Sequence, residues 1–322
     1  MKDLKWRDFN YVQEMETTFA GAGIATGLLL AITLALPSTA AITFDHVVVV
    51  IEENRGYSQI AGSASAPYIN ALAAGGALFS NYYAITHPSQ PNYLQLFSGS
   101  NQGVTSNATP AGKFSAPNLG GQLIAAGFTF KGFSEGLPSE SFNGDNAGGP
   151  DGYWRKHNPW INFIDVPAAS NRPFTDFPAD YTTLPTVSFI VPNQANDMHN
   201  GTIAQGDSWL QTNLGGYATW AATHNSLLIV TFDEDDGSEG NHVATIIFGA
   251  NVITGVYSDL FTTYSLLRTV EDLYGLPYAG AAASANSMAP FQPSAIPEPG
   301  TAVLMLAGLS CLLAVGKQGR RA

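Results

Sequence analysis

The sequence predicts an α/β fold in which helices cover both faces of a mainly parallel central sheet. Between residues 42 and 278, short and continuously apolar runs alternate with segments that have a helical pattern. Many of these runs are rich in β-branched residues, as strands buried on both faces of a parallel sheet are. Regular alternation of the two kinds of segment is typical of layered α/β domains. The chain has 322 residues and 45% hydrophobic residues, which is enough for a full core.

Strands are predicted wherever four to seven apolar residues lie between turn-forming residues. The first run, 46–51, has five consecutive β-branched residues after His46. Such a run fits a central strand with no face exposed to water. The predicted strands, in chain order, are 46–51, 78–84, 128–133, 187–191, 227–232 and 243–248.

Helices are predicted between these strands, with start and stop signals at several ends. Pro67 and Pro91 lie where a first-turn proline is tolerated, because its missing N–H has no partner there. Asp207 and Ser258 are candidate N-caps, and Gly275 is a stop signal. The predicted helices are 67–75, 91–98, 118–126, 207–222 and 258–274.

Residues 134–182 interrupt this alternation. The segment is rich in Gly, Pro, Asn and Ser, and it contains the aromatic stretch 153–160. Long irregular stretches inside compact domains are often functional lids or rims. The alternative interpretation is a surface excursion that an aromatic plug holds against the core. The sequence favours neither.

The charge balance restricts the class of partner. The formal net charge is −12, and six of the 13 Lys and Arg residues lie before residue 8 or after residue 316. Nucleic acid is therefore excluded as an expected partner, because phosphate backbones require a basic surface. A small phosphorylated substrate remains compatible, since a bound metal can supply local positive charge. The single cysteine, Cys311, excludes an intrachain disulfide.

Both chain ends have the composition of targeting segments. Residues 1–41 form a leader and signal peptide, with an apolar run at 20–37 followed by small residues. An uncleaved membrane anchor is the alternative. We expect the folded α/β domain to be 42–278, followed by an Ala-, Ser- and Pro-rich linker at 279–295.

The last segment, 296–322, contains Pro-Glu-Pro, a short apolar run and a basic tail, in that order. It resembles the bacterial PEP-CTERM sorting signal. The resemblance implies export across the inner membrane and transient anchoring through the C-terminal helix. It also implies an exosortase as processing partner. The expected location is periplasmic, cell-surface or extracellular, with an extracellular polysaccharide layer as a possible partner.

Polar residues follow four of the predicted strands directly. Open α/β sheets build their sites at the carboxyl ends of strands, so these residues are expected to form one site. Carboxylates, amide oxygens and imidazoles suit a divalent metal, and a hydroxyl beside them suits a nucleophile. The candidate metal ligands are Glu53, Asn54, Asp197, His199, Asp233, Glu234 and His242.

Ser89 is the candidate nucleophile, and it lies just upstream of Pro91 near the start of a predicted helix. On local sequence alone, a helix cap is the commoner role for a serine there. His199 and His242 are the candidate proton donors to the leaving group. His87 is interpreted as a turn or supporting residue, and Glu52 as a solvated residue that points away from Glu53.

Taken together, these segments resemble the bacterial phosphoesterase family that includes acid phosphatases and phospholipases C, within the alkaline-phosphatase-like superfamily. The resembling stretches are 46–54, 86–99, 196–199 and 228–234 with His242. The resemblance implies that Glu53 and Asn54 form the first metal and phosphate-site pair and that Ser89 is the nucleophile. It also implies an acidic pair at Asp233 and Glu234. Asp197, His199 and His242 would then be further ligands or phosphate contacts.

The sequence therefore predicts a secreted phosphoester hydrolase that uses a serine nucleophile and one or two divalent ions on a small phosphoester. A phospholipase C acting on phospholipid headgroups is the first alternative, with the aromatic stretch 153–160 as its lipid-contacting rim. A non-catalytic surface or matrix protein that retains the fold is the second.

Overall fold

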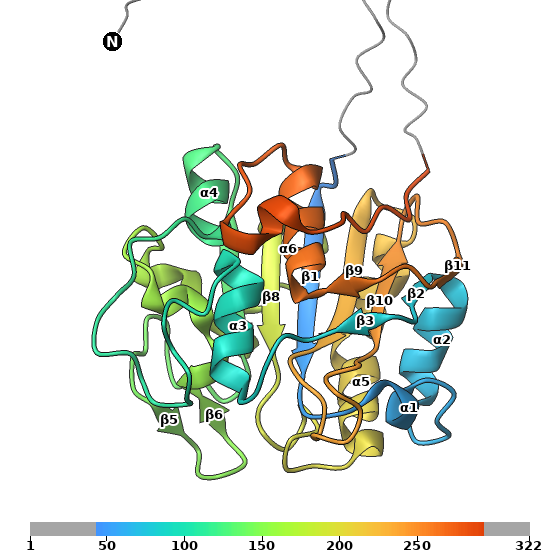
Figure 1. Ribbon diagram of the computed structural model, residues 1–322, viewed down its shortest axis with the longest axis horizontal. Helices are drawn as coiled ribbons and strands as arrows, with labels where there is room; N and C mark the ends of the chain where they lie inside the picture. Colours follow the sequence, from blue (N-terminus) through green and yellow to red (C-terminus); the bar gives the residue numbers. More distant parts are fainter. Residues whose placement is uncertain (1–42, 293–322) are drawn as a thin grey trace, which may run out of the picture. The chain divides into compact units, whose positions relative to one another are not determined.

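The computed structural model describes residues 43–292 (Figure 1). The predictions for residues 1–41 and 296–322 lie outside these residues. Within the described range, no helix combines the length and apolar content that crossing a membrane requires.

The central sheet has eight strands in the order β11-β2-β10-β9-β1-β8-β4-β7 (Figure 1). β1 lies near the middle and pairs in parallel with β8 and β9, so its predicted burial is confirmed. β10 runs antiparallel to both of its neighbours, and the remaining pairs are parallel. The strands are β1 (His46–Glu52), β2 (Ala77–Phe79), β4 (Phe130–Ser134), β7 (Asn171–Pro173), β8 (Val187–Val191), β9 (Ser226–Phe232), β10 (Thr245–Gly249) and β11 (Gly255–Tyr257).

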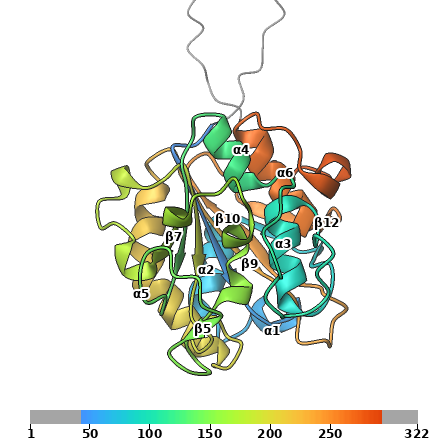
Figure 2. The same ribbon diagram turned by 90° about the vertical axis from the view of Figure 1, so that its left-hand side faces the viewer.

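Helices cover both faces of this sheet, as predicted. Figure 2 shows α3, α4 and α6 on one side of the strands and α5 on the other, and α2 packs against α5. The mainly parallel α/β fold is thus confirmed. The helices are α1 (Tyr57–Ile60), α2 (Pro67–Gly75), α3 (Ser89–Ser98), α4 (Leu119–Ala125), α5 (Ile203–Ala221) and α6 (Thr263–Leu273).

Some boundaries differ from the predictions for local physical reasons. The predicted strand 78–84 is two strands, because the chain turns after β2 and β3 (Tyr82–Tyr83) pairs with β12 (Phe261–Thr262) in a separate sheet. The helix predicted from Asp207 begins earlier, with Thr202 as its N-cap. The last helix begins after Thr262 rather than Ser258.

Asp207 is a cap, but of another helix. It lies inside α5 and is 2% exposed. Its carboxylate accepts hydrogen bonds from the backbone N–H groups of Tyr68 and Ile69, at 3.0 and 2.8 Å. These are free N–H groups of the first turn of α2, which an acidic side chain stabilises. Asp207 therefore ties α2 to α5.

The irregular segment 134–182 is held down by an aromatic plug, as one of the two interpretations expected. Trp160 is fully buried, and its indole N–H donates to Asn171 at 2.9 Å. Gly132 of β4 is required beneath it, because a Cβ there would lie 2.1 Å from the Trp160 ring. The segment also contains the short pair β5 (Asn146–Ala147) and β6 (Tyr153–Trp154) and a 3-10 turn, Arg155–His157.

Residues 279–292 belong to the folded body, so the linker predicted at 279–295 begins too early. Ala279 and Met288 are buried, and the Phe291 ring packs 5.3 Å from that of Phe44. Small apolar residues in this segment pack against α6 rather than remaining solvated, which composition alone did not indicate.

Glu271 of α6 provides a test of stability against pH. Its side chain is fully buried, and Oε1 accepts from the Ala279 N–H at 2.8 Å. Oε2 has no hydrogen-bond partner in the described range. Burial raises its pKa from 4.5 to about 8. The folded state therefore binds more protons than the unfolded state between these values, and stability falls as pH rises through them.

We expect Glu271→Gln to melt at a higher temperature than the wild type at pH 8.5 and at nearly the same temperature at pH 4.5. Glutamine keeps the acceptor for Ala279 and removes the buried charge. Thermal unfolding followed by circular dichroism at both pH values measures the difference. A difference in melting temperature between variant and wild type that is the same at both pH values would contradict the raised pKa of Glu271.

Candidate active site

The site lies at the carboxyl ends of β1, β8 and β9, where the strand-end rule places it. Ser89 is the first residue of α3 and is 1% exposed. Its hydroxyl lies within hydrogen-bonding distance of Glu53 Oε2 at 3.1 Å and Glu234 Oε1 at 3.2 Å. The N-cap of α3 is Pro88, and Ser89 makes no capping hydrogen bond. The cap interpretation is therefore wrong, because the hydroxyl is directed at the two carboxylates.

Glu53 connects Ser89 to the rest of the site. It directly follows β1 and is fully buried. Oε1 accepts from the Tyr93 hydroxyl at 2.7 Å and lies 2.9 Å from His157 Nε2. Burial by itself would raise the pKa of Glu53, but the charge and hydrogen bond of His157 lower it to about 2. Glu53 is therefore held as a carboxylate.

His157 is a site residue that the sequence analysis did not select. It lies in the 3-10 turn of the aromatic segment, is 1% exposed and stacks on Tyr93 with ring centroids 4.9 Å apart. Burial lowers its pKa, and Glu53 opposes that effect. In the sequence, His157 is marked only by its place in the aromatic stretch 153–160, which the phospholipase C alternative assigned to a lipid-contacting rim.

Asp197 joins this group from the loop that follows β8. Its Oδ1 accepts from the His199 N–H at 2.8 Å, and its own carbonyl accepts from the Glu53 N–H at 2.7 Å. Oδ2 lies 3.8 Å from His157 Nδ1 and has no hydrogen-bond partner in the part of the chain that the structure describes. Burial, and then the charge of Glu53, raise the pKa of Asp197.

Asp233 and Glu234 follow β9 and complete the acidic cluster. Asp233 Oδ1 accepts from the N–H groups of Asn54 and Glu234 at 3.3 and 2.7 Å. Asn92 donates to Glu234 Oε2 at 3.2 Å. Burial and the nearby Glu53 raise the pKa of Asp233 well above its usual range and that of Glu234 to about 7.

His87 supports this cluster from the side, as expected. Its ring nitrogens lie 3.1 Å from Glu234 Oε2 and 3.1 Å from Asp235 Oδ1. Glu52 is buried, so the expectation of a solvated side chain is wrong. Neither of its carboxylate oxygens has a hydrogen-bond partner among the described residues, and burial raises its pKa.

The donor atoms of this group fit a divalent cation. Ligand atoms of Glu53, His157 and Asp197 lie within 4.8 Å of one another. Carboxylate and amide oxygens with imidazole are suitable ligands for such ions. Further oxygens are buried and have no hydrogen-bond partner within residues 43–292. They belong to Asn54 (Oδ1), Asp197 (Oδ2) and Asp233 (Oδ2). Buried polar atoms usually have partners, so three such atoms in one cluster fit the ligand set of a divalent cation.

Two predicted histidines stand apart from the cluster. His242 stacks between Tyr57 and Tyr83, with ring centroids at 4.6 and 4.9 Å, and its Nε2 lies 2.9 Å from the carbonyl oxygen of Ser80. Its backbone forms an antiparallel bridge with Tyr83, which directs the ring toward the tyrosines. The expected convergence of His242 with Ser89 is therefore not observed. His199 is half-buried at the rim, and its Nδ1 lies 2.7 Å from Asn200 Oδ1.

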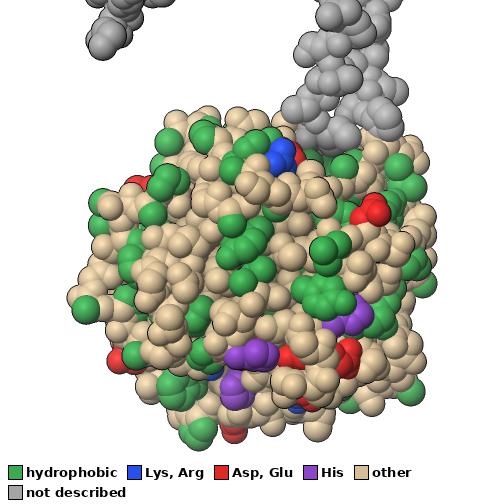
Figure 3. Space-filling model, in the orientation of Figure 1, with side chains coloured by type: hydrophobic (Ala, Val, Ile, Leu, Met, Phe, Trp, Pro, Cys, Tyr) green, Lys and Arg blue, Asp and Glu red, His purple; other side chains and the backbone are tan. Residues whose placement is uncertain are grey.

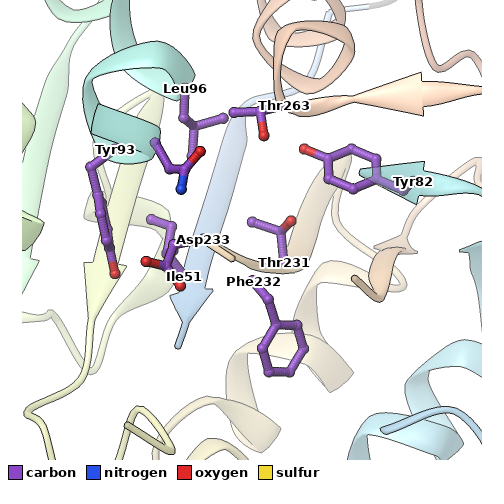
Figure 4. A pocket seen from close by; sticks show the side chains of 9 residues that line it. Ile51, Tyr82, Tyr93, Leu96, Thr231, Phe232, Asp233 and Thr263 are labelled. Atoms are coloured by element: carbon purple, nitrogen blue, oxygen red, sulfur yellow. The ribbon is translucent and has the colours of Figure 1, made fainter. Parts of the chain in front are cut away.

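A small cavity lies behind the acidic cluster, between α3, α6 and the strand ends (Figure 4). Its volume is about 10 Å³, which is room for roughly one water molecule. Figure 4 shows Asp233 on one side and the Tyr82 hydroxyl directed toward Thr231 and Thr263 on the other. A cavity of this size excludes substrate from this side. Figure 3 shows histidine and acidic side chains on the surface near the lower end of the molecule, the end to which β1 points in Figure 1.

Comparison with known proteins decides the family. A sequence model of the Phosphoesterase family matches residues 63–277. The chain belongs to the Phosphoesterase family. This phosphoesterase is 50% identical over 252 residues to a phosphatidylinositol-3-phosphatase of Mycobacterium tuberculosis, covering 78% of this chain and 83% of the relative. It is 30% identical over 259 residues to an acid phosphatase of Aspergillus fumigatus, covering 74% of this chain and 57% of that protein.

Solved structures agree with the fold. A protein of the alkaline phosphatase superfamily from Vibrio parahaemolyticus aligns with a TM-score of 0.54 and 13% identity, covering 75% of this chain and 69% of the other. The phosphonate monoester hydrolase of Silicibacter pomeroyi aligns with a TM-score of 0.52 and 13% identity, covering 79% and 78%. The predicted alkaline-phosphatase-like fold is thus confirmed. The phosphoesterase is a phosphoric ester hydrolase, as its family and its phosphatase relatives show.

Proposed function

We propose that this phosphoesterase is an exported phosphomonoesterase in which Ser89 attacks phosphorus and a divalent ion assists. The observation that carries the proposal is the position of the Ser89 hydroxyl between the carboxylates of Glu53 and Glu234. The residues that would hold the ion are Glu53, Asn54, Asp197, Asp233 and Glu234, with His157. A bound divalent ion would supply the positive charge that favours the alkoxide form of serine and neutralises phosphoryl oxygens.

The residues of the chain contribute orientation and proton transfer. The two carboxylates accept the hydroxyl hydrogen of Ser89, so that an oxygen lone pair is free to face the substrate. Ser89 is the first residue of α3, and the positive end of the helix dipole there favours negative charge on the phosphoryl oxygens. In-line attack by Oγ forms a phosphoseryl intermediate and expels the alcohol, and His199 at the rim is the proposed proton donor to it. Water then attacks phosphorus and releases phosphate and Ser89.

One basic side chain favours monoesters over diesters. Seven Lys and Arg residues fall in the described range, and five of them bond to carbonyls, amides or acids. Only Lys113 and Lys156 have no such partner in that range. Lys156 directly precedes His157. Burial raises the pKa of Asp197 and Glu234, and the positive charge of Lys156 lowers it.

Lys156 is therefore proposed to contact the phosphoryl group. A phosphomonoester dianion gains more from this cation than a diester monoanion does. The names of the mycobacterial and fungal relatives denote phosphomonoesterases, which supports the same preference. A phosphomonoester, free or on a lipid headgroup, is the proposed substrate class.

We expect the purified protein to hydrolyse p-nitrophenyl phosphate faster than bis(p-nitrophenyl) phosphate. Lys156→Met should lower kcat/KM for the monoester by roughly 10- to 100-fold and affect the diester less, because one charge-assisted contact is lost. Lys113→Met, which removes the other partnerless lysine, is the matched control and should change neither rate. Faster diester hydrolysis, or release of phosphocholine from phosphatidylcholine, would instead favour the phospholipase C alternative.

Export remains a proposal that rests on the terminal sequences. Signal-peptide features at 1–41 and the resemblance of 296–322 to a sorting signal support passage through the membrane and processing by an exosortase. The two ends of the folded body, marked by Phe44 and Phe291, meet at the amino edge of the sheet, opposite the site (Figure 1). A tether at either end would therefore leave the site unobstructed. Cell fractionation of the full chain and of a chain ending at residue 295 tests this location.

A further inference from the structure

Two loops of the site contain residues with an uncommon backbone conformation. Asn54, after β1, has φ of 52°, and Met198, after β8, has φ of 75°. Residues other than glycine seldom adopt this left-handed region, and they persist there only when the surroundings enforce it. Asn54 is itself a proposed ligand, and Met198 follows the proposed ligand Asp197. The conformation of these two residues therefore decides where both ligands point.

The guanidinium of Arg55 bonds to the carbonyl oxygens of both residues. Nη1 donates to Asn54 O at 2.9 Å, and Nη2 donates to Met198 O at 2.6 Å and to Gly201 O at 3.1 Å. No acidic group forms an ion pair with Arg55 among residues 43–292, although the chain is strongly acidic. The hydrogen bonds of the Arg55 guanidinium therefore all go to backbone carbonyl oxygens of the two loops.

We propose that Arg55 is a positioning residue that holds the two ligand loops in their left-handed conformations, so that Asn54 and Asp197 face the cation site. Their partnerless oxygens, Asn54 Oδ1 and Asp197 Oδ2, are both buried. The bond from the Glu53 N–H to Asp197 O, at 2.7 Å, joins the same loops but fixes neither left-handed residue. The inference rests on the proposed metal-assisted function.

The geometry requires arginine rather than any cation. A planar guanidinium presents donors in several fixed directions, whereas an ammonium is a compact point charge on a flexible stem. Arg55→Lys keeps the charge but cannot hold three carbonyls in the same arrangement. Arg55→Ala removes every bond.

The test compares Arg55→Ala and Arg55→Lys with a matched control, Arg268→Ala. Arg268 also donates to backbone carbonyls, those of Ala282 and Ala283, but it lies on α6, away from the site. Three quantities are measured on the purified protein: kcat and KM for p-nitrophenyl phosphate, the Kd for Mn²⁺ by calorimetry, and the melting temperature.

We expect Arg55→Ala to lower kcat at least 30-fold with little change in KM, and to raise the Kd for Mn²⁺ at least 10-fold. Arg55→Lys should show an intermediate loss, and millimolar guanidinium should restore part of the kcat of Arg55→Ala. Arg268→Ala should lower the melting temperature and leave kcat and the Kd unchanged. A purely structural role for Arg55 would lower the melting temperature alone and would give no guanidinium rescue.

Wild-type kcat in either folded Arg55 variant would overturn the inference. If Arg55→Ala does not fold, the lysine variant decides, since it keeps the stem and the charge. If the wild type binds no Mn²⁺, the kcat of Arg55→Ala and its rescue by guanidinium test the inference. An active Ser89→Ala variant would reject the proposed function itself, whereas normal kcat in the Arg55 variants would reject only the positioning role.

Discussion

We expect Ser89→Ala to abolish phosphomonoester turnover and to leave the fold intact. Among the described residues, Ser89 is the only serine or threonine whose hydroxyl bonds to the acidic cluster, and its loss closes the covalent route. We expect kcat to fall by roughly 10⁴-fold or more, as when a catalytic nucleophile is removed. The melting temperature should change little, because Pro88 is the N-cap of α3 and no cap is lost. Steady-state kinetics and calorimetry measure the two effects separately.

A neighbouring hydroxyl provides the control for this prediction. Thr86 belongs to the same loop, but its hydroxyl donates to the carbonyl oxygen of His87 and is exposed. Thr86→Val should therefore keep near-wild-type kcat. Mass spectrometry of acid-quenched wild-type reactions should find the phosphoryl group on Ser89. An inactive Thr86 variant beside an active Ser89 variant would place the nucleophile three residues earlier.

Removal of divalent ions is expected to have the second-largest effect, and it acts on both activity and stability. Burial raises the pKa of Asp197 and Asp233, and Glu53 adds to the rise. Without a cation, these carboxylates are desolvated and repel one another. An ion at 100 times its Kd stabilises the folded state by about 2.7 kcal/mol. For a domain of this size, we therefore expect chelation to lower the melting temperature by roughly 5 to 10 °C and to abolish turnover.

The direction of the pH dependence follows from the same acids. Their raised pKa values mean that the metal-free folded state binds more protons than the unfolded state, so its stability falls as pH rises. The difference in melting temperature between ion-loaded and chelated protein should thus be larger at pH 8 than at pH 5. Asp233→Asn, which removes one proposed ligand, should reduce that difference. Full kcat in protein shown to be metal-free by elemental analysis would rule out the metal.

Local sequence determined those features that depend on near neighbours. The five β-branched residues of β1 predict a buried strand wherever it lies, and Pro67 predicts the start of α2 because its ring restricts only adjacent backbone. The strand-end rule placed Glu53, Asp197 and Asp233 at one edge of the sheet, after the adjacent parallel strands β1, β8 and β9. It succeeded because the carboxyl ends of parallel neighbours necessarily meet. Ser89 reaches the site at the start of α3, outside this rule.

Tertiary structure decided where side chains point and which distant segments meet. Asp207 has the chemistry of a cap, but only packing of α5 against α2 shows that it caps Tyr68 and Ile69. His242 follows the right strand, yet its bridge to Tyr83 turns its ring away from Ser89. His157 enters from a segment without periodicity, and Trp160 packing on Gly132 sets its path. Sequence patterns report backbone periodicity, whereas these contacts depend on packing between elements far apart in the chain.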